Sequence, residues 1–268
     1  DGIRDTSVTG VQTCALPILS GNPEKPWLTF SNSLATNLHM WDDQATALAD
    51  DFHILRYDKR GHGQSEPVSG AYSFDDLIAD VVGLWDHLGI EKTHFVGLSI
   101  GGMTAQGIML KHADRLMSVV IANSMGKVAP EFVSAWQDRI DLSREKGMDP
   151  LIQPTMERWF TEEYRNQGTA EAQAIADMIA TTSVNGYAGC ASAIQNLSYL
   201  DSLDQITGLP VLFIAGAQDA GTPPAGMEAM HANMPGSEYV LLDPAAHISN
   251  VERSADFTQT LSGFLAKH

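Results

Sequence analysis

The sequence THFVGLSIGGMTAQ, Thr93–Gln106, combines the patterns of a strand, a sharp turn and the start of a helix. Thr93–Val96 is a short apolar run typical of a buried strand, and Gly102–Gln106 has the small residues of a tightly packed helix start. Between them, GLSIG at Gly97–Gly101 fits Gly-x-Ser-x-Gly, in which a serine occupies a sharp turn between a strand and a helix. The strained backbone of such a turn leaves no space for neighbouring side chains, hence the glycines. We therefore predict a nucleophile at Ser99.

The chain from Trp27 onward alternates short apolar runs with helical patterns. This alternation is typical of βα units, so we expect an α/β fold with a mostly parallel sheet and helices on both faces. We expect strands at Trp27–Ser31, Phe52–Tyr57, Thr93–Gly97, Met117–Asn123, Pro210–Gly216 and Glu238–Asp243. We expect helices at Asp43–Ala49, Phe74–Leu88, Ile100–Lys111, Pro224–Asn233 and Val251–Ala266.

The strand signal disappears between residues 129 and 203, where the sequence is helical in character. We interpret 129–203 as a helical cap inserted between two parts of one core, 19–128 and 204–268. The cap is expected over the carboxyl edge of the sheet, where open α/β sheets bind ligands. Its aromatic residues either face a ligand or form the core of the cap itself, as buried aromatics usually do.

A serine hydroxyl is a weak nucleophile at neutral pH, so a base is needed beside it. His247 lies in DPAAHISN, after the last expected strand and before the final helix, which is where this chain order places a catalytic histidine. The rival is His62 in RYDKRGHGQS, where glycine-flanked polar residues more often shape a loop. We favour His247 as the base.

The acid that orients this histidine should follow an earlier strand. PVLFIAGAQD ends in Asp219 and is followed by turn residues, so Asp219 is the preferred acid. Asp243 and Asp204 are alternatives. This fold sometimes places the acid after the strand expected at Met117–Asn123. Here that position has Asn123 and Ser124 but no carboxylate.

Two backbone N–H groups are needed to stabilise the oxyanion of acyl transfer. We expect one from Ile100, directly after the nucleophile. We expect the other from Leu34 in SNSLATN, where Asn32 and Ser33 stand in place of the usual His-Gly.

The composition excludes several classes of function. The 268 residues carry 16 Lys and Arg against 33 Asp and Glu, a net charge of −17, which disfavours nucleic acid and anionic membranes as partners. The two cysteines, Cys14 and Cys190, are too few for a disulfide framework or a thiolate zinc site. A 44% hydrophobic content suits a single globular domain, either a monomer or a homo-oligomer.

Residues 1–18, DGIRDTSVTGVQTCALPI, show no periodicity of a strand or a helix. Plausible codons for DGIRD and VTGVQTCALPI resemble a sequencing-library adapter with a short index between its two parts. We therefore interpret this leader as a translated adapter and expect it to take no part in the fold.

The segments SNSLATNLHMW, LRYDKRGHGQS, HFVGLSIGG, AGAQDAGTPP and AAHISN resemble the 3-oxoadipate enol-lactonases and their α/β-hydrolase relatives. The resemblance extends through the cap, in WQDRI at 136–140, ERWFT at 157–161 and GYAGCASAI at 186–194. It implies hydrolysis of an enol-lactone that bears a carboxymethyl arm. It also implies a cytoplasmic role in aromatic catabolism, with neither a metal nor an organic cofactor.

The front of the chain departs from this pattern, because the family has two strands before the one expected at Trp27. Part of the sheet edge is therefore expected to be missing, and an exposed edge invites pairing with another chain. A promiscuous carboxylesterase or another lactonase is the alternative function, since a fold does not fix a substrate. A serine-type haloperoxidase and a non-catalytic ligand-binding protein are weaker alternatives.

An anionic lactone needs a local cation, because the net charge of the protein repels it. Arg139 and Arg158 lie close in sequence to Trp136 and Trp159, and these four cap residues are the candidates for substrate binding. The alternative is that both arginines form ordinary ion pairs with neighbouring acids such as Asp138 and Glu157.

Overall fold

A seven-stranded sheet with the order β1-β3-β2-β4-β5-β6-β7 forms the centre of the protein, in a computed structural model that describes residues 17–268. β1 is antiparallel to β3, and all other neighbouring strands are parallel. The strands are β1 (Pro17–Gly21), β2 (Trp27–Ser31), β3 (His53–Tyr57), β4 (Thr93–Leu98), β5 (Leu116–Ala122), β6 (Val211–Gly216) and β7 (Glu238–Leu242).

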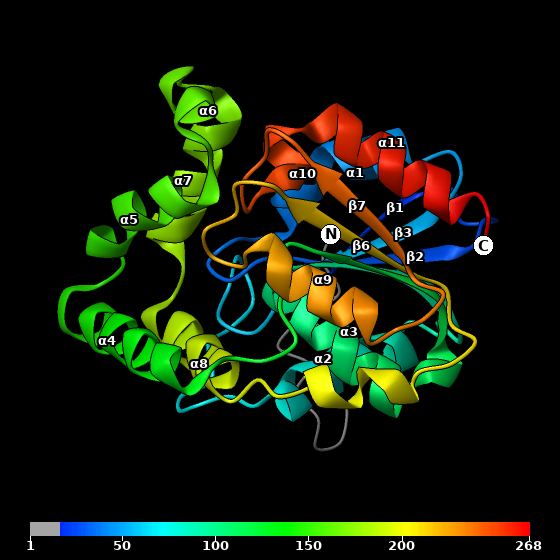
Figure 1. The fold of residues 1–268 in the computed structure, drawn as a ribbon, viewed down its shortest axis with the longest axis horizontal. Helices are drawn as coiled ribbons and strands as arrows, with labels where there is room; N and C mark the ends of the chain where they lie inside the picture. Colours follow the sequence, from blue (N-terminus) through cyan, green and yellow to red (C-terminus); the bar gives the residue numbers. More distant parts are fainter. Residues whose placement is uncertain (1–16) are drawn as a thin grey trace.

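Helices cover both faces of this sheet. In Figure 1, α1 and α11 lie over one face, and α2, α3 and α9 lie over the other. Their bounds are α1 (Asp42–Ala47), α2 (Phe74–His87), α3 (Ile100–Lys111), α9 (Pro224–Ala232), α10 (Ser249–Glu252) and α11 (Ser254–Leu265), with short 3-10 turns η1 (Leu38–Trp41) and η2 (Ala113–Arg115).

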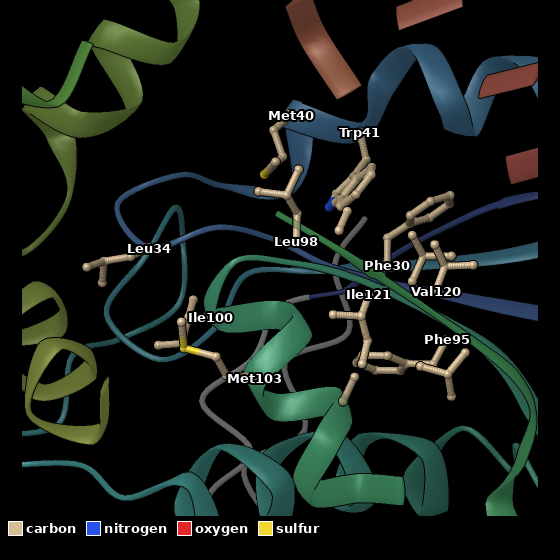
Figure 2. Packing of buried hydrophobic residues seen from close by; sticks show 14 of the residues in the cluster. Phe30, Leu34, Met40, Trp41, Phe95, Leu98, Ile100, Met103, Val120 and Ile121 are labelled. Atoms are coloured by element: carbon tan, nitrogen blue, oxygen red, sulfur yellow. The ribbon is translucent and has the colours of Figure 1, made fainter. Parts of the chain in front are cut away.

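The core forms on both sides of the central strands because successive side chains of a strand point to opposite faces. Figure 2 shows Val120 on the same side as Trp41, whereas Ile121 points toward α3. The ring centroids of Phe30 and Trp41 lie 4.8 Å apart. β4 and β6 are buried along their whole length, as expected for parallel strands covered on two faces.

The register of the sheet places the ends of the central strands side by side. Ser31 of β2 pairs with Gly97 of β4, and Leu98 of β4 pairs with Ala122 of β5. Ala122 is in turn level with Ile214 of β6. The loops that follow these four strands therefore emerge at one edge of the sheet.

A helical insertion follows β5 and precedes β6, as expected for the cap. It consists of α4 (Pro130–Lys146), α5 (Asp149–Trp159), α6 (Glu162–Asn166), α7 (Ala170–Thr181), α8 (Val184–Gln195) and the 3-10 turn η3 (Leu200–Gln205). Figure 1 shows α4–α7 standing beside the sheet rather than over one of its faces.

At one point the backbone of the insertion lies directly against the backbone of the core, with no side chain between them. A Cβ built on Gly186 of α8 would lie 2.2 Å from the Gly61 carbonyl oxygen. A Cβ on Gly61, which has φ +71°, would lie 2.3 Å from the Gly186 Cα. Both residues must therefore be glycine for the two backbones to approach this closely.

The expected strands are all present, with each end within one residue of its expected position. One expected helix is wrong in detail: Val251–Ala266 is two helices, α10 and α11, separated at Arg253. Arg253 has φ −124° and ψ 49°, outside the helical region. The preceding Glu252 side chain accepts hydrogen bonds from backbone N–H groups of Thr161 and Ala246 on two other segments.

The start of the described chain also differs from expectation. Pro17 and Ile18, which we assigned to the leader, pair with Tyr57 and Arg56 of β3 as part of β1. The unpaired edge of β3 offers hydrogen-bonding groups to any adjacent segment, which explains this pairing. Of the two strands that the resemblance implies before β2, the described residues contain one. The rest of the expected leader, residues 1–16, lies outside the described residues.

In residues 17–268 no helix is long and apolar enough to cross a bilayer.

Two truncations separate the leader from the edge strand. Deleting residues 1–16 should leave Tm within about 2 °C, because we interpret that segment as translated adapter. Deleting residues 1–21 also removes β1, uncovers the edge of β3 and should lower Tm by roughly 4–8 °C, the equivalent of about 2 kcal/mol. Thermal unfolding followed by circular dichroism measures both values. Equal Tm values for the two truncations would show that β1 contributes nothing to the sheet.

Candidate active site

Ser99 occupies a strained turn between β4 and α3. Its φ of 57° and ψ of −118° are rare for a residue with a side chain. A Cβ on Gly97 would lie 2.3 Å from the carbonyl carbon of Gly101. A Cβ on Gly101 would lie 2.2 Å from the Ser31 carbonyl oxygen at the end of β2. The glycines of the motif are therefore required by the close approach of three backbone segments.

The backbone of Ser99 is fixed by the end of β5. Its N–H donates to the Ala122 carbonyl over 2.9 Å, and its carbonyl accepts from the Ser124 hydroxyl over 2.9 Å. The same carbonyl accepts from the Met103 N–H over 2.9 Å, which starts the first turn of α3. These bonds hold the serine at the edge of the sheet where the loops meet.

His247 and Asp219 form a buried hydrogen-bonded pair. His247 Nδ1 lies 2.8 Å from Asp219 Oδ2, and each residue is 3% exposed. Asp219 Oδ2 also accepts from the Thr222 hydroxyl at 2.6 Å, and Oδ1 accepts from the N–H groups of Gly221 and Thr222 at 2.8 and 2.9 Å. An ionised carboxylate suits all these donors.

The ionisation of Asp219 follows from its surroundings. Burial alone raises the pKa of this carboxyl, but the charge and hydrogen bond of His247 and the bonds from Thr222 outweigh it and hold the pKa below its usual value. Asp219 is therefore a carboxylate at neutral pH. It can hold the His247 ring in one tautomer, with Nδ1 protonated and Nε2 free to accept a proton.

The rival residues are placed elsewhere. His62 is fully buried and bonds through Nδ1 to the Arg60 carbonyl at 3.1 Å, and burial lowers its pKa to about 3. Asp243 and Asp204 are exposed and make no hydrogen bond to His247 in the described part of the chain. The structure thus brings Asp219, and not these carboxylates, to the histidine.

Asn123 connects three of the loops at this edge, and the sequence reasoning assigned it no such role. Its side-chain amide donates to Asp219 Oδ2 at 3.1 Å and to the Ala246 carbonyl at 3.0 Å. Its carbonyl oxygen accepts from the Ser249 hydroxyl at 2.5 Å. No local sequence pattern marks this role, because the partners lie on other loops; the φ of 43° at Asn123 is one that asparagine tolerates.

The cap directly contacts the loop that carries His247. The Trp159 ring stacks on the His247 ring with centroids 5.7 Å apart and 29° between the planes. The Trp159 carbonyl accepts from the Ile248 N–H at 3.1 Å. Of the cap residues chosen from the sequence, Trp159 is therefore the one that the structure places against the histidine.

Glu252 strengthens this connection between the cap and the histidine loop. One carboxylate oxygen accepts from the N–H of Thr161 at 3.1 Å and from its hydroxyl. The other accepts from the Ala246 N–H at 2.7 Å, one residue before His247. The sequence does not reveal this role, because the partners of Glu252 lie on other segments and no local pattern marks them.

Two backbone N–H groups, one on the loop after β2 and one directly after Ser99, have no partner in the described part of the chain. Neither the Leu34 N–H nor the Ile100 N–H donates a hydrogen bond to any group of residues 17–268. Figure 2 shows Leu34 on the loop after β2 and Ile100 at the start of α3. Free donors of this kind are what an oxyanion-binding site needs.

Arg139 and Arg158 of the cap are not neutralised by an ion pair within residues 17–268. Neither Arg139 nor Arg158 has a carboxylate oxygen within 4 Å among the described residues, so the expected alternative pairing with Asp138 and Glu157 is absent there. The Arg139 guanidinium lies 4.8 Å from the centroid of the Trp136 ring. Burial and the charge of Arg139 both lower the pKa of Arg158.

Together these groups can perform nucleophilic chemistry at a carbonyl. A serine on a strained turn, a histidine held by a carboxylate and two free N–H donors are the parts that acyl transfer requires. Residues 17–268 contain no group of three or more His, Cys, Asp or Glu side chains that could hold a metal ion.

Comparison with known proteins gives consistent relatives. Residues 21–254 match the family model described as the alpha/beta hydrolase fold. The 3-oxoadipate enol-lactonase 2 of Acinetobacter baylyi is 36% identical over 92% of this chain and 91% of its own. The crystal structure of the enol-lactonase from Burkholderia xenovorans superposes with a TM-score of 0.90 at 37% identity, covering 94% of this chain and 96% of that one. A more distant relative, the putative carbamate hydrolase RutD of Stutzerimonas stutzeri, is 27% identical over 91% of this chain and 93% of its own.

Replacing Glu252 by alanine tests the connection between the cap and the histidine loop. The change removes the acceptor of three hydrogen bonds, so Tm should fall by roughly 5–10 °C, and NMR signals of the His247 ring should shift or broaden. The exposed Glu163 of α6 provides a matched control, and Glu163→Ala should change Tm by less than about 2 °C. Equal Tm values and unchanged His247 signals would contradict this role.

Proposed function

Because the chain belongs to the 3-oxoadipate enol-lactonase family of α/β-hydrolases, we propose that it hydrolyses 3-oxoadipate enol-lactone to 3-oxoadipate through an acyl-enzyme on Ser99. The buried hydrogen bond between His247 and Asp219 is the observation that carries this proposal. The relative named 3-oxoadipate enol-lactonase 2 supports the choice of substrate. The proposal places the reaction in the cytoplasm, as a step of aromatic catabolism.

In the first half of the proposed reaction, His247 Nε2 takes the hydroxyl proton as Ser99 Oγ attacks the lactone carbonyl carbon. Asp219 stabilises the imidazolium that forms, and the N–H groups of Leu34 and Ile100 stabilise the oxyanion. The ring C–O bond then breaks, and His247 returns its proton to the departing enolate oxygen. The resulting enol tautomerises to the ketone, while the acyl group stays on Ser99.

In the second half, a water molecule attacks the acyl carbon and gives its proton to His247. The bond to Ser99 Oγ breaks, and the proton passes from the imidazolium to the serine oxygen. The products are the free carboxylate and the original hydroxyl. Stacking of Trp159 on His247 places the cap where it can exclude other water from this step.

A promiscuous carboxylesterase or another lactonase on the same scaffold is the alternative, and the relative named as a carbamate hydrolase adds carbamates to the substrates to be tested. Turnover of a small p-nitrophenyl ester, a simple carbamate and the enol-lactone, compared as kcat/KM, distinguishes these functions. The absence of hydrolysis of all three would favour a ligand-binding protein.

The cap arginines are proposed to bind the carboxylate of the substrate. Arg158 and Arg139 lie close enough for the charge of one to lower the pKa of the other, and no carboxylate of residues 17–268 neutralises either by an ion pair. Burial raises the pKa of the nearby Tyr187 hydroxyl, while the charges of both arginines lower it. Two cations that act on one another, one of them beside Trp136, suit an anionic group in an acidic protein, and a guanidinium can bind such a group through two hydrogen bonds.

Substitutions in the triad test the proposed mechanism. Ser99→Ala and His247→Ala should each lower kcat by roughly 10⁴-fold or more, and the double variant should be little worse because these groups act as a unit. Asp219→Asn should lower kcat by roughly 10³- to 10⁴-fold through loss of the correct tautomer. Steady-state hydrolysis of the enol-lactone gives these values. Near-additive losses, or a mild Asp219→Asn with a severe Asp243→Asn, would show that the triad is misassigned.

Substitutions in the cap test how the carboxylate is recognised. Arg139→Leu or Arg158→Leu should raise KM for the enol-lactone by roughly ten- to a hundredfold, because each removes a charge-assisted hydrogen bond. KM for a neutral p-nitrophenyl ester should hardly change. Arg144→Leu, an exposed arginine on α4, is the control and should affect neither substrate. Equal effects on the lactone and the ester would remove these arginines from the binding site.

A further inference from the structure

Lys59 is a buried cation that forms no ion pair with any of the described residues. It follows β3, is 3% exposed, and has no carboxylate oxygen within 4 Å of its ammonium among residues 17–268. The neighbouring Asp58 uses its two oxygens to accept from the N–H groups of Leu38 and Gln64, at 2.8 and 3.0 Å. Burying an ammonium that has no ion pair is unfavourable, so the position of Lys59 calls for a specific role.

The partners of this ammonium are two main-chain carbonyls of the loop after β2. Lys59 Nζ donates to the Asn32 carbonyl at 2.6 Å and to the Ser33 carbonyl at 3.1 Å. The same loop also lies against the serine turn, since a Cβ on Gly101 would lie 3.0 Å from the Asn32 carbonyl oxygen. The loop is thus in contact with both Lys59 and the turn that carries Ser99.

The geometry of the peptide bond means that the contact of Lys59 with the Ser33 carbonyl also sets the direction of the Leu34 N–H. The Ser33 carbonyl and the Leu34 N–H belong to one planar trans peptide, so they point in opposite directions. Fixing the carbonyl on Lys59 therefore directs the N–H away from Lys59. A cation on the carbonyl also polarises the peptide and makes its N–H a stronger donor.

We propose that Lys59 is a positioning residue of the oxyanion hole, which holds the Asn32 and Ser33 carbonyls so that the Leu34 N–H points to the oxyanion formed on attack by Ser99. This role rests on the proposed serine hydrolysis. It requires the protonated ammonium, because a neutral amine is a weaker donor and carries no charge to polarise the peptide.

The protonation of Lys59 changes in an accessible pH range. Burial lowers its pKa to about 8, although the Coulombic effects of Cys190 and Asp58 oppose this. The other titratable groups that face it keep one state there: burial lowers the pKa of His62 to about 3 and raises that of the Cys190 thiol of α8 to about 12. Below about pH 8 Lys59 is charged, so kcat should fall as pH rises through this value.

Three variants test this role. Lys59→Met should lower kcat for the lactone or ester by roughly 30- to 300-fold with KM changed less than about threefold, because the misdirected donor acts on the oxyanion rather than on the bound substrate. The variant should also lose the fall in kcat near pH 8. Lys59→Arg should retain more activity and move that fall to higher pH, since a guanidinium stays charged. Lys111→Met, an exposed lysine that pairs with Asp75, is the control and should match the wild type.

The outcomes separate this inference from the proposed function. If the wild-type protein hydrolyses neither lactone nor ester, the proposed function fails and the role of Lys59 fails with it. If the wild type is active and Lys59→Met keeps its kcat, or loses activity through KM alone, only the role of Lys59 is overturned. Should Lys59→Met fail to fold, the wild-type pH profile decides: a kcat that stays constant from pH 7 to 10 overturns the role, and a fall near pH 8 that Lys59→Arg moves upward supports it.

Discussion

The close approach of the serine turn to the end of β2 is the constraint on which the rest of the site depends. Position 101 must be glycine, because a Cβ there would lie only 2.2 Å from the Ser31 carbonyl oxygen. This contact sets the distance between the loop that carries Leu34 and the start of α3, which carries Ile100. The strained backbone of Ser99 is tolerated because the end of β5 holds it by hydrogen bonds from both sides.

Charge is distributed unevenly in this protein. The chain as a whole carries a net charge of −17, yet the cations near the site, Lys59, Arg139 and Arg158, make no ion pair with the described residues. One follows β3, where its ammonium donates to two main-chain carbonyls of the loop after β2, and two lie in the cap. Local fields in a poorly hydrated site outweigh those of exposed, screened charges, so the acidic surface is compatible with an anionic substrate.

The sequence predicted the parts of the structure that local chemistry determines. Ser99 could be located because its turn requires glycines, and the strands because their apolar runs are bounded by turn residues. Asn123 and Glu252 could not, because their hydrogen-bond partners, such as main-chain atoms of Ala246, lie on other segments that only the fold brings close. The break at Arg253 carries no glycine or proline to mark it.

The contact between Gly61 and Gly186 has a consequence for engineering. Side chains at an interface can repack when one partner is exchanged, but two backbones in direct contact cannot. A cap taken from another protein would therefore fit this core only if its helix brought a glycine to the same point at the same angle. The interchangeable unit for building chimeras is thus α8 together with the Gly61 loop, rather than the cap alone.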